Sequence, residues 1–150
     1  MKLRTKARSV ALQVLYELDI TSHQPLVVWE ERVKESELDS KLSEFARQII
    51  LGILPIRTQL DTFISQHAPE WPLDQVAIID RNILRIALWE FGVFGKTPIK
   101  VAINEAVELA KIFGSDSAPR FVNGVLGSLA ARQNEIQQSL THWKESNQEG

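Results

Sequence analysis

The chain has 150 residues, 17.0 kDa and 44% hydrophobic residues, so it is long enough to form one domain with its own core. Charged residues make up 24% of it, and no apolar run approaches the roughly 18 residues that span a bilayer, so we expect no membrane anchor. Cys is absent, which excludes disulfides and thiolate chemistry and is typical of a reducing, cytoplasmic setting.

The formal net charge of -2 is unevenly distributed. Lys2, Arg4, Lys6 and Arg8 occupy every second position of the first eight residues, where no acidic residue occurs. The other 142 residues contain 13 Lys and Arg against 19 Asp and Glu, a net charge of -6. A basic end on an acidic body is typical of an arm that binds a polyanion, and equally of a solubilising tail.

Apolar residues recur at intervals of three and four almost throughout the chain, which predicts an all-α fold. A first helix is expected over about residues 4–19, docked by one apolar stripe. This stripe consists of Leu3, Ala7, Val10, Ala11, Val14 and Leu18. At about 100° per residue, Arg4 and Arg8 fall together on one flank and Lys6 on the other. Tyr16 points away from the stripe, toward water or a partner.

Three segments with recognisable helix or boundary signals follow. "LVVWEERVKE" predicts a short amphipathic helix, and a longer helix is expected from about Asp39 to Gln66, with a kink or break at Pro55. "HAPEWP", residues 67–72, is the best candidate for a boundary. We therefore expect a single domain with an N-terminal helical half (about 1–68), a C-terminal half (about 72–133) and a terminal helix or tail (134–150).

The next expected helix, about residues 73–91, is apolar nearly all round, which is typical of a central helix. Two carboxylates, Asp80 and Glu90, fall on or beside its main stripe, where each needs a partner. For Glu90, an internal bond to Arg or backbone is the better explanation. For Asp80, which is nearer the edge, contact with a partner protein stays open.

Two further helices complete the pattern. One begins at Thr97, whose side chain is suited to capping, and ends at Gly114. The other begins near Pro119 and contains Gly124 and Gly127, which weaken a helix and so indicate close packing against a neighbour.

The sequence contains no recognisable catalytic or metal-binding pattern. His23, His67 and His142 are far apart, and there is no Cys to complete a zinc site. Asp80 and Glu90 would lie about 15 Å apart along one helix, too far to act as a carboxylate pair. We therefore expect no enzymatic activity, no metal and no cofactor.

The segment "RFVNG", residues 120–124, is not explained by the core alone. Arg120 and Phe121 place a cation beside an aromatic face, and Asn123 is a modest helix former. RNA-binding surfaces use Lys and Arg for phosphates and aromatic faces for unstacked bases. Packing explains Phe121 at least as well, so both interpretations stay open from these residues alone.

Three blocks of the chain resemble the NusB family of antitermination factors, in the family's order: "RTKARSVALQVLY", "IDRNILRIALWE" and "PIKVAINEAVELAKIFGSDSAPRFVNGVLG". The resemblance covers about residues 2–130. It implies a helical bundle of about seven helices in two packed halves, without catalytic activity. It also implies pairing with NusE, a ribosomal small-subunit protein, and recognition of single-stranded boxA RNA in nascent transcripts, notably ribosomal RNA. RNA polymerase in this antitermination complex then resists termination.

The resemblance also assigns roles to individual positions. Those expected at the RNA are Lys2, Arg4, Lys6, Arg8, Arg120, Phe121 and Asn123. Those expected at or near the protein-partner face are Tyr16 and Asp80. Lys6 stands where relatives carry further arginine, and Lys lacks the guanidinium fork, so RNA affinity without NusE is expected to be weak.

Two other interpretations remain. The same helical module resembles the N-terminal part of certain ribosomal RNA cytosine methyltransferases, whose chains continue into a catalytic domain. A helical protein adaptor that does not bind RNA is the other. The sequence leaves open whether the free protein is a monomer or a homodimer.

Overall fold

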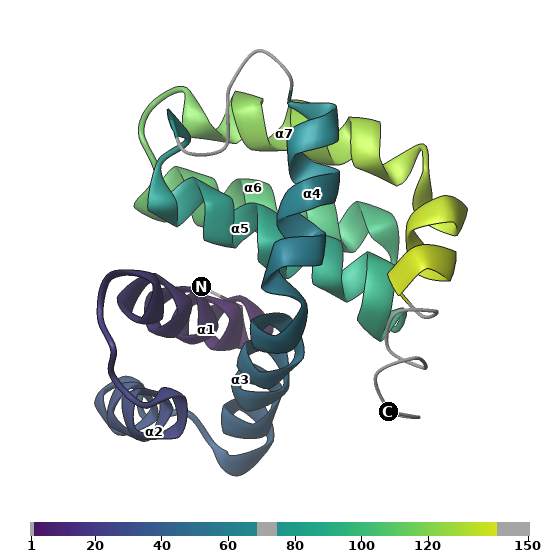
Figure 1. Cartoon of the computed structure of the whole chain (residues 1–150). Helices are drawn as coiled ribbons and strands as arrows, with labels where there is room; N and C mark the ends of the chain where they lie inside the picture. Colours follow the sequence, from purple (N-terminus) through teal and green to yellow (C-terminus); the bar gives the residue numbers. More distant parts are fainter. Residues whose placement is uncertain (1, 69–74, 141–150) are drawn as a thin grey trace.

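Figure 1 shows the computed structural model of the chain, which describes residues 2–68 and 75–140. These residues contain seven named α-helices, a further helical segment at residues 133–140, short 3-10 and π-helical turns, and no strand, which confirms the all-α class. The helices are α1 (Leu3–Ile20), α2 (Pro25–Ser36), α3 (Ser40–Ile53), α4 (Arg57–His67), α5 (Ile78–Trp89), α6 (Ile99–Phe113) and α7 (Ala118–Ala130). The turn η1 (Leu54–Ile56) joins α3 to α4, the π-helical turn η3 (Glu90–Phe94) extends α5, and residues 133–140 are also helical.

The helices form two groups around α5. Helices α1, α2 and α3 pack together in the lower part of Figure 1, and α6 and α7 pack together above them. Helix α5 contacts both groups, and every residue from Asn82 to Gly92 is buried. The central position predicted for this helix is therefore confirmed, and one continuous apolar core runs from Ala7 to Leu140.

The break expected at Pro55 is present, because η1 separates α3 from α4 there. Helix α4 then packs on α5 and α7, and the His67 ring lies 2.7 Å from the Ser128 hydroxyl of α7. The helix before η1, α3, therefore packs against α1 and α2, and the helix after it, α4, packs against α5 and α7. The expected boundary at 67–72 lies mostly outside the described residues.

Three local expectations are corrected. Helix α5 begins at Ile78 rather than near 73, because Ala77 is extended with ψ 139. Thr97 does not cap α6: its hydroxyl donates to the buried carboxylate of Glu90 at 2.9 Å. A Cβ on Gly124 or Gly127 would meet nothing within 4 Å, so close packing does not explain these glycines.

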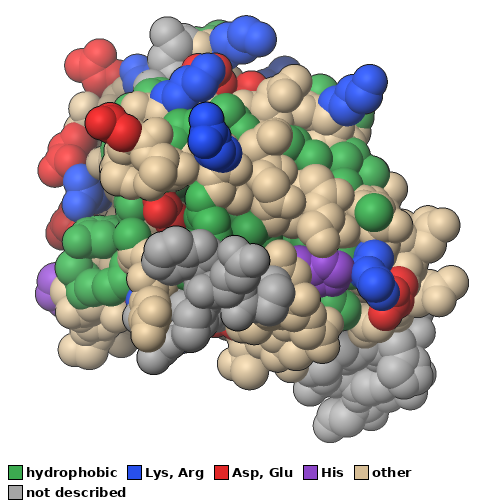
Figure 2. All heavy atoms as spheres, turned by 90° about the horizontal axis from the view of Figure 1, so that it is seen from above, with side chains coloured by type: hydrophobic (Ala, Val, Ile, Leu, Met, Phe, Trp, Pro, Cys, Tyr) green, Lys and Arg blue, Asp and Glu red, His purple; other side chains and the backbone are tan. Residues whose placement is uncertain are grey.

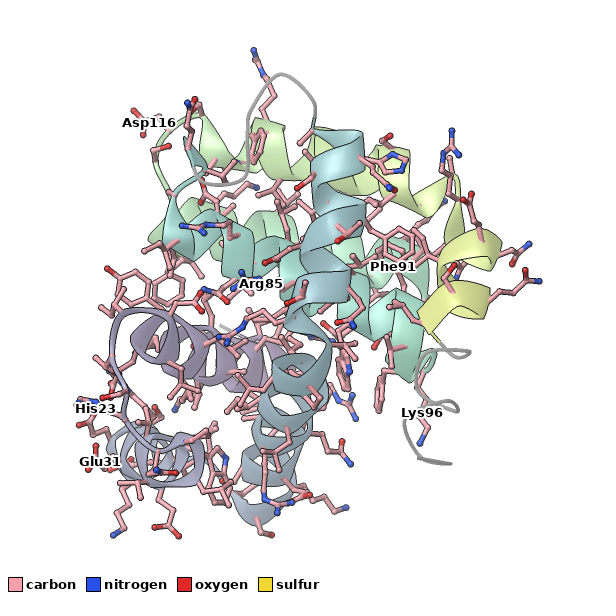
Figure 3. The ribbon with its side chains drawn as sticks, in the orientation of Figure 1. His23, Glu31, Arg85, Phe91, Lys96 and Asp116 are labelled. Atoms are coloured by element: carbon pink, nitrogen blue, oxygen red, sulfur yellow. The ribbon has the colours of Figure 1, made fainter. Side chains whose placement is uncertain are left out.

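A charged cluster centred on Arg85 ties α1, α4 and α5 together (Figure 3). Arg85 is buried and makes two 2.7 Å bonds to Asp61 of α4 and one 2.8 Å bond to Asp19 of α1. Asp19 also accepts from Asn82 of α5 and from Arg57. Burial lowers the pKa of Arg85, but the hydrogen bonds and charges of Asp61 and Asp19 outweigh it, so that pKa is raised. This cluster fixes α1 on the central helix.

Candidate nucleic-acid interface

The first turn of α1 carries cations at the N-terminal end, where positive charge is least favourable for a helix. Lys2 and Arg4 are exposed and Lys6 is half-buried. Among the described residues, no side chain caps this turn and no acidic residue lies in it. A helix N-terminus has free N–H groups and a partial positive charge, so these cations raise its positive potential further. The end of α1 is therefore electrostatically suited to phosphate.

Arg4 is placed by an aromatic side chain of α3. Its Cζ lies 4.8 Å from the centroid of the Phe45 ring, a cation–π contact that leaves the residue exposed. Leu3, expected in the apolar stripe, is 68% exposed instead. The buried stripe starts later because the first turn of α1 projects beyond the core that Ala7 begins.

Arg8 shares a flank of α1 with Arg4, as expected, because both guanidiniums lie over the Phe45 ring, but Arg8 is buried and not accessible to RNA. The side chain is only 3% exposed, and it donates from Nε and Nη2 to the two carboxylate oxygens of Glu90 at 2.9 and 2.7 Å. Glu90 is 1% exposed, so its charge requires a partner inside the protein. The internal Arg bond expected for Glu90 is thus confirmed.

A second acidic residue completes the attachment of this end of α1. Glu105 of α6 lies 3.5 Å from Nη1 of Arg8 and accepts a 2.6 Å hydrogen bond from Thr5. Thr97 donates to Oε1 of Glu90, the oxygen that also accepts from Nη2 of Arg8. We call the set Thr5, Arg8, Glu90, Thr97 and Glu105 the arm anchor, because it joins the basic end of α1 to η3 and α6.

Arg120 and Phe121 lie together with Asp80 at a separate place. The three line a hollow of about 350 Å³ between the start of α5 and the start of α7. Arg120 is exposed, while Phe121 is half-buried and packs against the core. Asn123 is exposed on the next turn. Seen from above (Figure 2), hydrophobic side chains lie between separated Lys and Arg side chains on this face.

Asp80 is buried at the edge of that hollow. Its Oδ1 has no hydrogen-bond partner among the described residues, and burial raises the pKa of this carboxyl. It lies next to Gly114, the expected end of α6, where a Cβ would meet the Cβ of Ala118 at 2.6 Å. The close approach of α6 and α7 therefore requires that glycine.

Tyr16 is 39% exposed, as expected for a residue that points away from the stripe. It belongs to the C-terminal half of α1, which the 2.8 Å bond from Asn82 to Asp19 joins to the start of α5. Ile20, on the next turn of α1, is also exposed. The two residues expected at a partner face, Tyr16 and Asp80, thus come from helices that meet at this place.

The structure does not bring all expected RNA residues together. Lys2, Arg4 and Lys6 lie at the N-terminal end of α1, whereas Arg120 and Phe121 lie on α7. Helices α5 and α6 lie between α1 and α7 (Figure 1). A ligand that contacts both regions must therefore be extended.

Lys96 is a further exposed cation near the aromatic rings that support Arg4. Gly95 has a φ of 71, in the left-handed region, and the chain turns there. Lys96 points away from the helices (Figure 3), with its Nζ 5.3 Å from the centroid of Phe94. The Phe94 ring lies 6.3 Å from the Phe45 ring, over which Arg4 lies. This contact between distant parts of the chain brings Lys96 near the ring that supports Arg4. No sequence spacing signals this.

These features define a class: an all-helical binding protein whose basic helix end suits a polyanion. Among the described residues, no group of side chains could hold a metal ion, and no helix is long and apolar enough to cross a membrane. The NusB family model matches residues 5–131, and the chain belongs to this family.

Individual relatives agree with the family assignment. The chain is 46% identical over 135 residues to the transcription antitermination protein NusB of Roseiflexus sp. (strain RS-1), covering 89% of this chain and 95% of the relative. Its structure is similar to T. maritima NusB, with a TM-score of 0.76, 31% identity and 90% of both chains covered. It is also similar to a chain in the crystal structure of antitermination factors NusB and NusE in complex with dsRNA, with a TM-score of 0.76, 25% identity, and 93% of this chain and 98% of that chain covered.

Proposed function

We propose that the protein is a transcription antitermination factor that binds boxA RNA of nascent ribosomal RNA transcripts together with NusE. The observation that carries this proposal is the uncapped, cationic start of α1, on a chain whose relatives are named transcription antitermination proteins. The solved complex of NusB, NusE and dsRNA supports both partners. The protein then acts as a binding component of the RNA polymerase antitermination complex in the cytoplasm, not as an enzyme.

The basic end of α1 supplies the electrostatic part of RNA binding in this proposal. Lys2, Arg4 and Lys6 neutralise phosphates, and the helix N-terminus adds its own positive potential. This contribution is independent of base sequence. It therefore explains attraction to RNA and leaves the choice of boxA to other residues.

Base contact is assigned to the segment on α7. Phe121 has a face that is only half-buried, and Asn123 carries both a donor and an acceptor in the open. Arg120 provides a charge beside them. Tyr16, which is exposed on the part of α1 joined to α5, faces NusE, and Asp80 lies buried near that face. NusE then extends the RNA-binding surface.

Salt dependence tests the role of the basic end. Three phosphate contacts predict that log affinity for single-stranded RNA falls with log salt at a slope of about −2, from about −0.7 per contact. Arg4→Ala should weaken binding and reduce the slope by about 0.7. Arg132→Ala is the matched control, because Arg132 is exposed, outside both regions and paired with Glu135.

Two results would contradict the proposal. A slope near zero for the unaltered protein would remove the basic end from RNA binding. Equal affinity of boxA and a scrambled RNA in the presence of NusE would leave a helical adaptor without specific RNA recognition. Both measurements use fluorescence anisotropy of labelled RNA, as a single strand and as a duplex, since the solved complex contains dsRNA.

A further inference from the structure

We infer that Arg8 is a positioning residue and not a phosphate ligand, and that Glu90 and Glu105 hold the basic end of α1 in its RNA-binding geometry. This inference rests on the proposed function. It explains how Arg8, one of the cations at the basic end of α1, acts, and it assigns a positioning role in RNA binding to Glu90 and Glu105.

The hydrogen bonds of Arg8 leave no room for a phosphate. Both oxygens of Glu90 accept from its guanidinium, and Glu105 lies 3.5 Å from the remaining terminal nitrogen. The Phe45 ring covers the guanidinium, with its centroid 5.3 Å from Cζ. Only 3% of the Arg8 side chain is exposed, so its charge is paired inside the protein and is not available to RNA.

The start of α1 needs such an attachment. It has no cap among the described residues, and its cations oppose the helix dipole, so by itself this turn would fray. The arm anchor prevents this at two points: Arg8 binds Glu90, and Thr5, between Arg4 and Lys6 in the chain, binds Glu105.

Arg4 and Arg8 also share one support. Both guanidiniums lie over the Phe45 ring, at 4.8 and 5.3 Å from its centroid. Arg4 is one helical turn before Arg8, so fixing Arg8 fixes the place from which Arg4 reaches solvent. Ordering these side chains in the free protein reduces the entropy lost on RNA binding.

Glu90→Gln separates positioning from simple electrostatics. The substitution removes a negative charge close to the basic end, and electrostatics alone predicts tighter RNA binding. Loss of the anchor predicts the opposite: binding about three- to tenfold weaker, with an unchanged salt slope, because no phosphate contact is removed. Glu108→Gln is the matched control, since Glu108 is an exposed carboxylate on α6 paired with Lys111. It should bind RNA as tightly as the unaltered protein, or more tightly.

A second variant tests Arg8 itself and guards against misfolding of the first. Arg8→Met combined with Glu90→Met replaces a buried ion pair by apolar side chains of similar length, which proteins often tolerate. If Arg8 only positions the helix, the double variant keeps the salt slope of the unaltered protein. A slope reduced by about 0.7 would show that Arg8 contacts phosphate and would overturn the inference.

A measurement without RNA keeps this inference distinct from the proposed function. Hydrogen exchange of the α1 amides should be faster near Arg8 in Glu90→Gln, and unchanged in Glu108→Gln. Unchanged exchange in Glu90→Gln would refute the anchor, whatever the protein binds. If exchange rises as expected but the unaltered protein binds no RNA, the anchor stands and the proposed function fails.

Discussion

Replacing Arg85 with Met should destabilise the fold more than any change at the basic surface. Its guanidinium makes two 2.7 Å bonds to Asp61 and bonds Asp19 at 2.8 Å, so the variant leaves two carboxylates short of a partner. Removing one member of a buried ion pair costs about 3–5 kcal/mol. Asp61 is partly exposed, and Asp19 keeps Asn82, so water and the remaining donors offset part of this. We expect a loss of about 3 kcal/mol.

Urea denaturation followed by far-UV circular dichroism at pH 7 measures this loss as a lower midpoint with an unchanged m-value. At about 2–4 °C per kcal/mol for a chain of this size, the melting temperature should fall by about 6–12 °C. Arg132→Met, which removes an exposed ion pair with Glu135, should change stability by less than about 0.5 kcal/mol. A loss below about 1 kcal/mol in Arg85→Met would refute the cluster as the link between α1 and α5.

Three further predictions concern the fold. Burial raises the pKa of Asp80 above its ordinary 3.8. Between pH 3.8 and this raised pKa the folded state binds more protons than the unfolded state, so the stability of the fold falls as the pH rises through that range. Asp80→Asn should therefore be more stable than the unaltered protein at pH 7, by about 1 kcal/mol, with no difference below pH 3.8 in thermal melts. Gly95→Ala should cost about 1–2 kcal/mol because of its φ of 71, whereas Gly127→Ala, with nothing near its Cβ, should stabilise α7 by up to about 1 kcal/mol; calorimetry distinguishes the two. We also propose that the chain is one folding domain: circular dichroism and tryptophan fluorescence should give coincident transitions, and two separate transitions would contradict this.

The helices could be predicted because their information is local. Apolar spacing gave α1, α2 and the central α5, and the missing donor of Pro55 gave the break between α3 and α4. Glu90 in an apolar stripe even indicated an internal counter-charge.

The site could be predicted only in part, because its partners are distant in sequence. The helical period places Arg8 beside Arg4 but says nothing of Glu90, which is 82 residues away and draws Arg8 inward. Thr97 stands at a suitable position for a helix cap, yet its hydroxyl donates to the buried carboxylate of Glu90 instead. Where a buried charge competes with local geometry, the buried charge prevails, since leaving it unpaired costs more than losing a cap.

The antitermination role depends above all on specific RNA binding, which is measured with labelled boxA RNA and a scrambled RNA, each with and without NusE. We expect weak, salt-sensitive binding by the chain alone. With NusE, boxA should bind at least about tenfold more tightly, a gain of about 1.4 kcal/mol, and with a clear preference over the scrambled RNA. Identical affinities for both RNAs with NusE present, or no gain from NusE, would contradict this role.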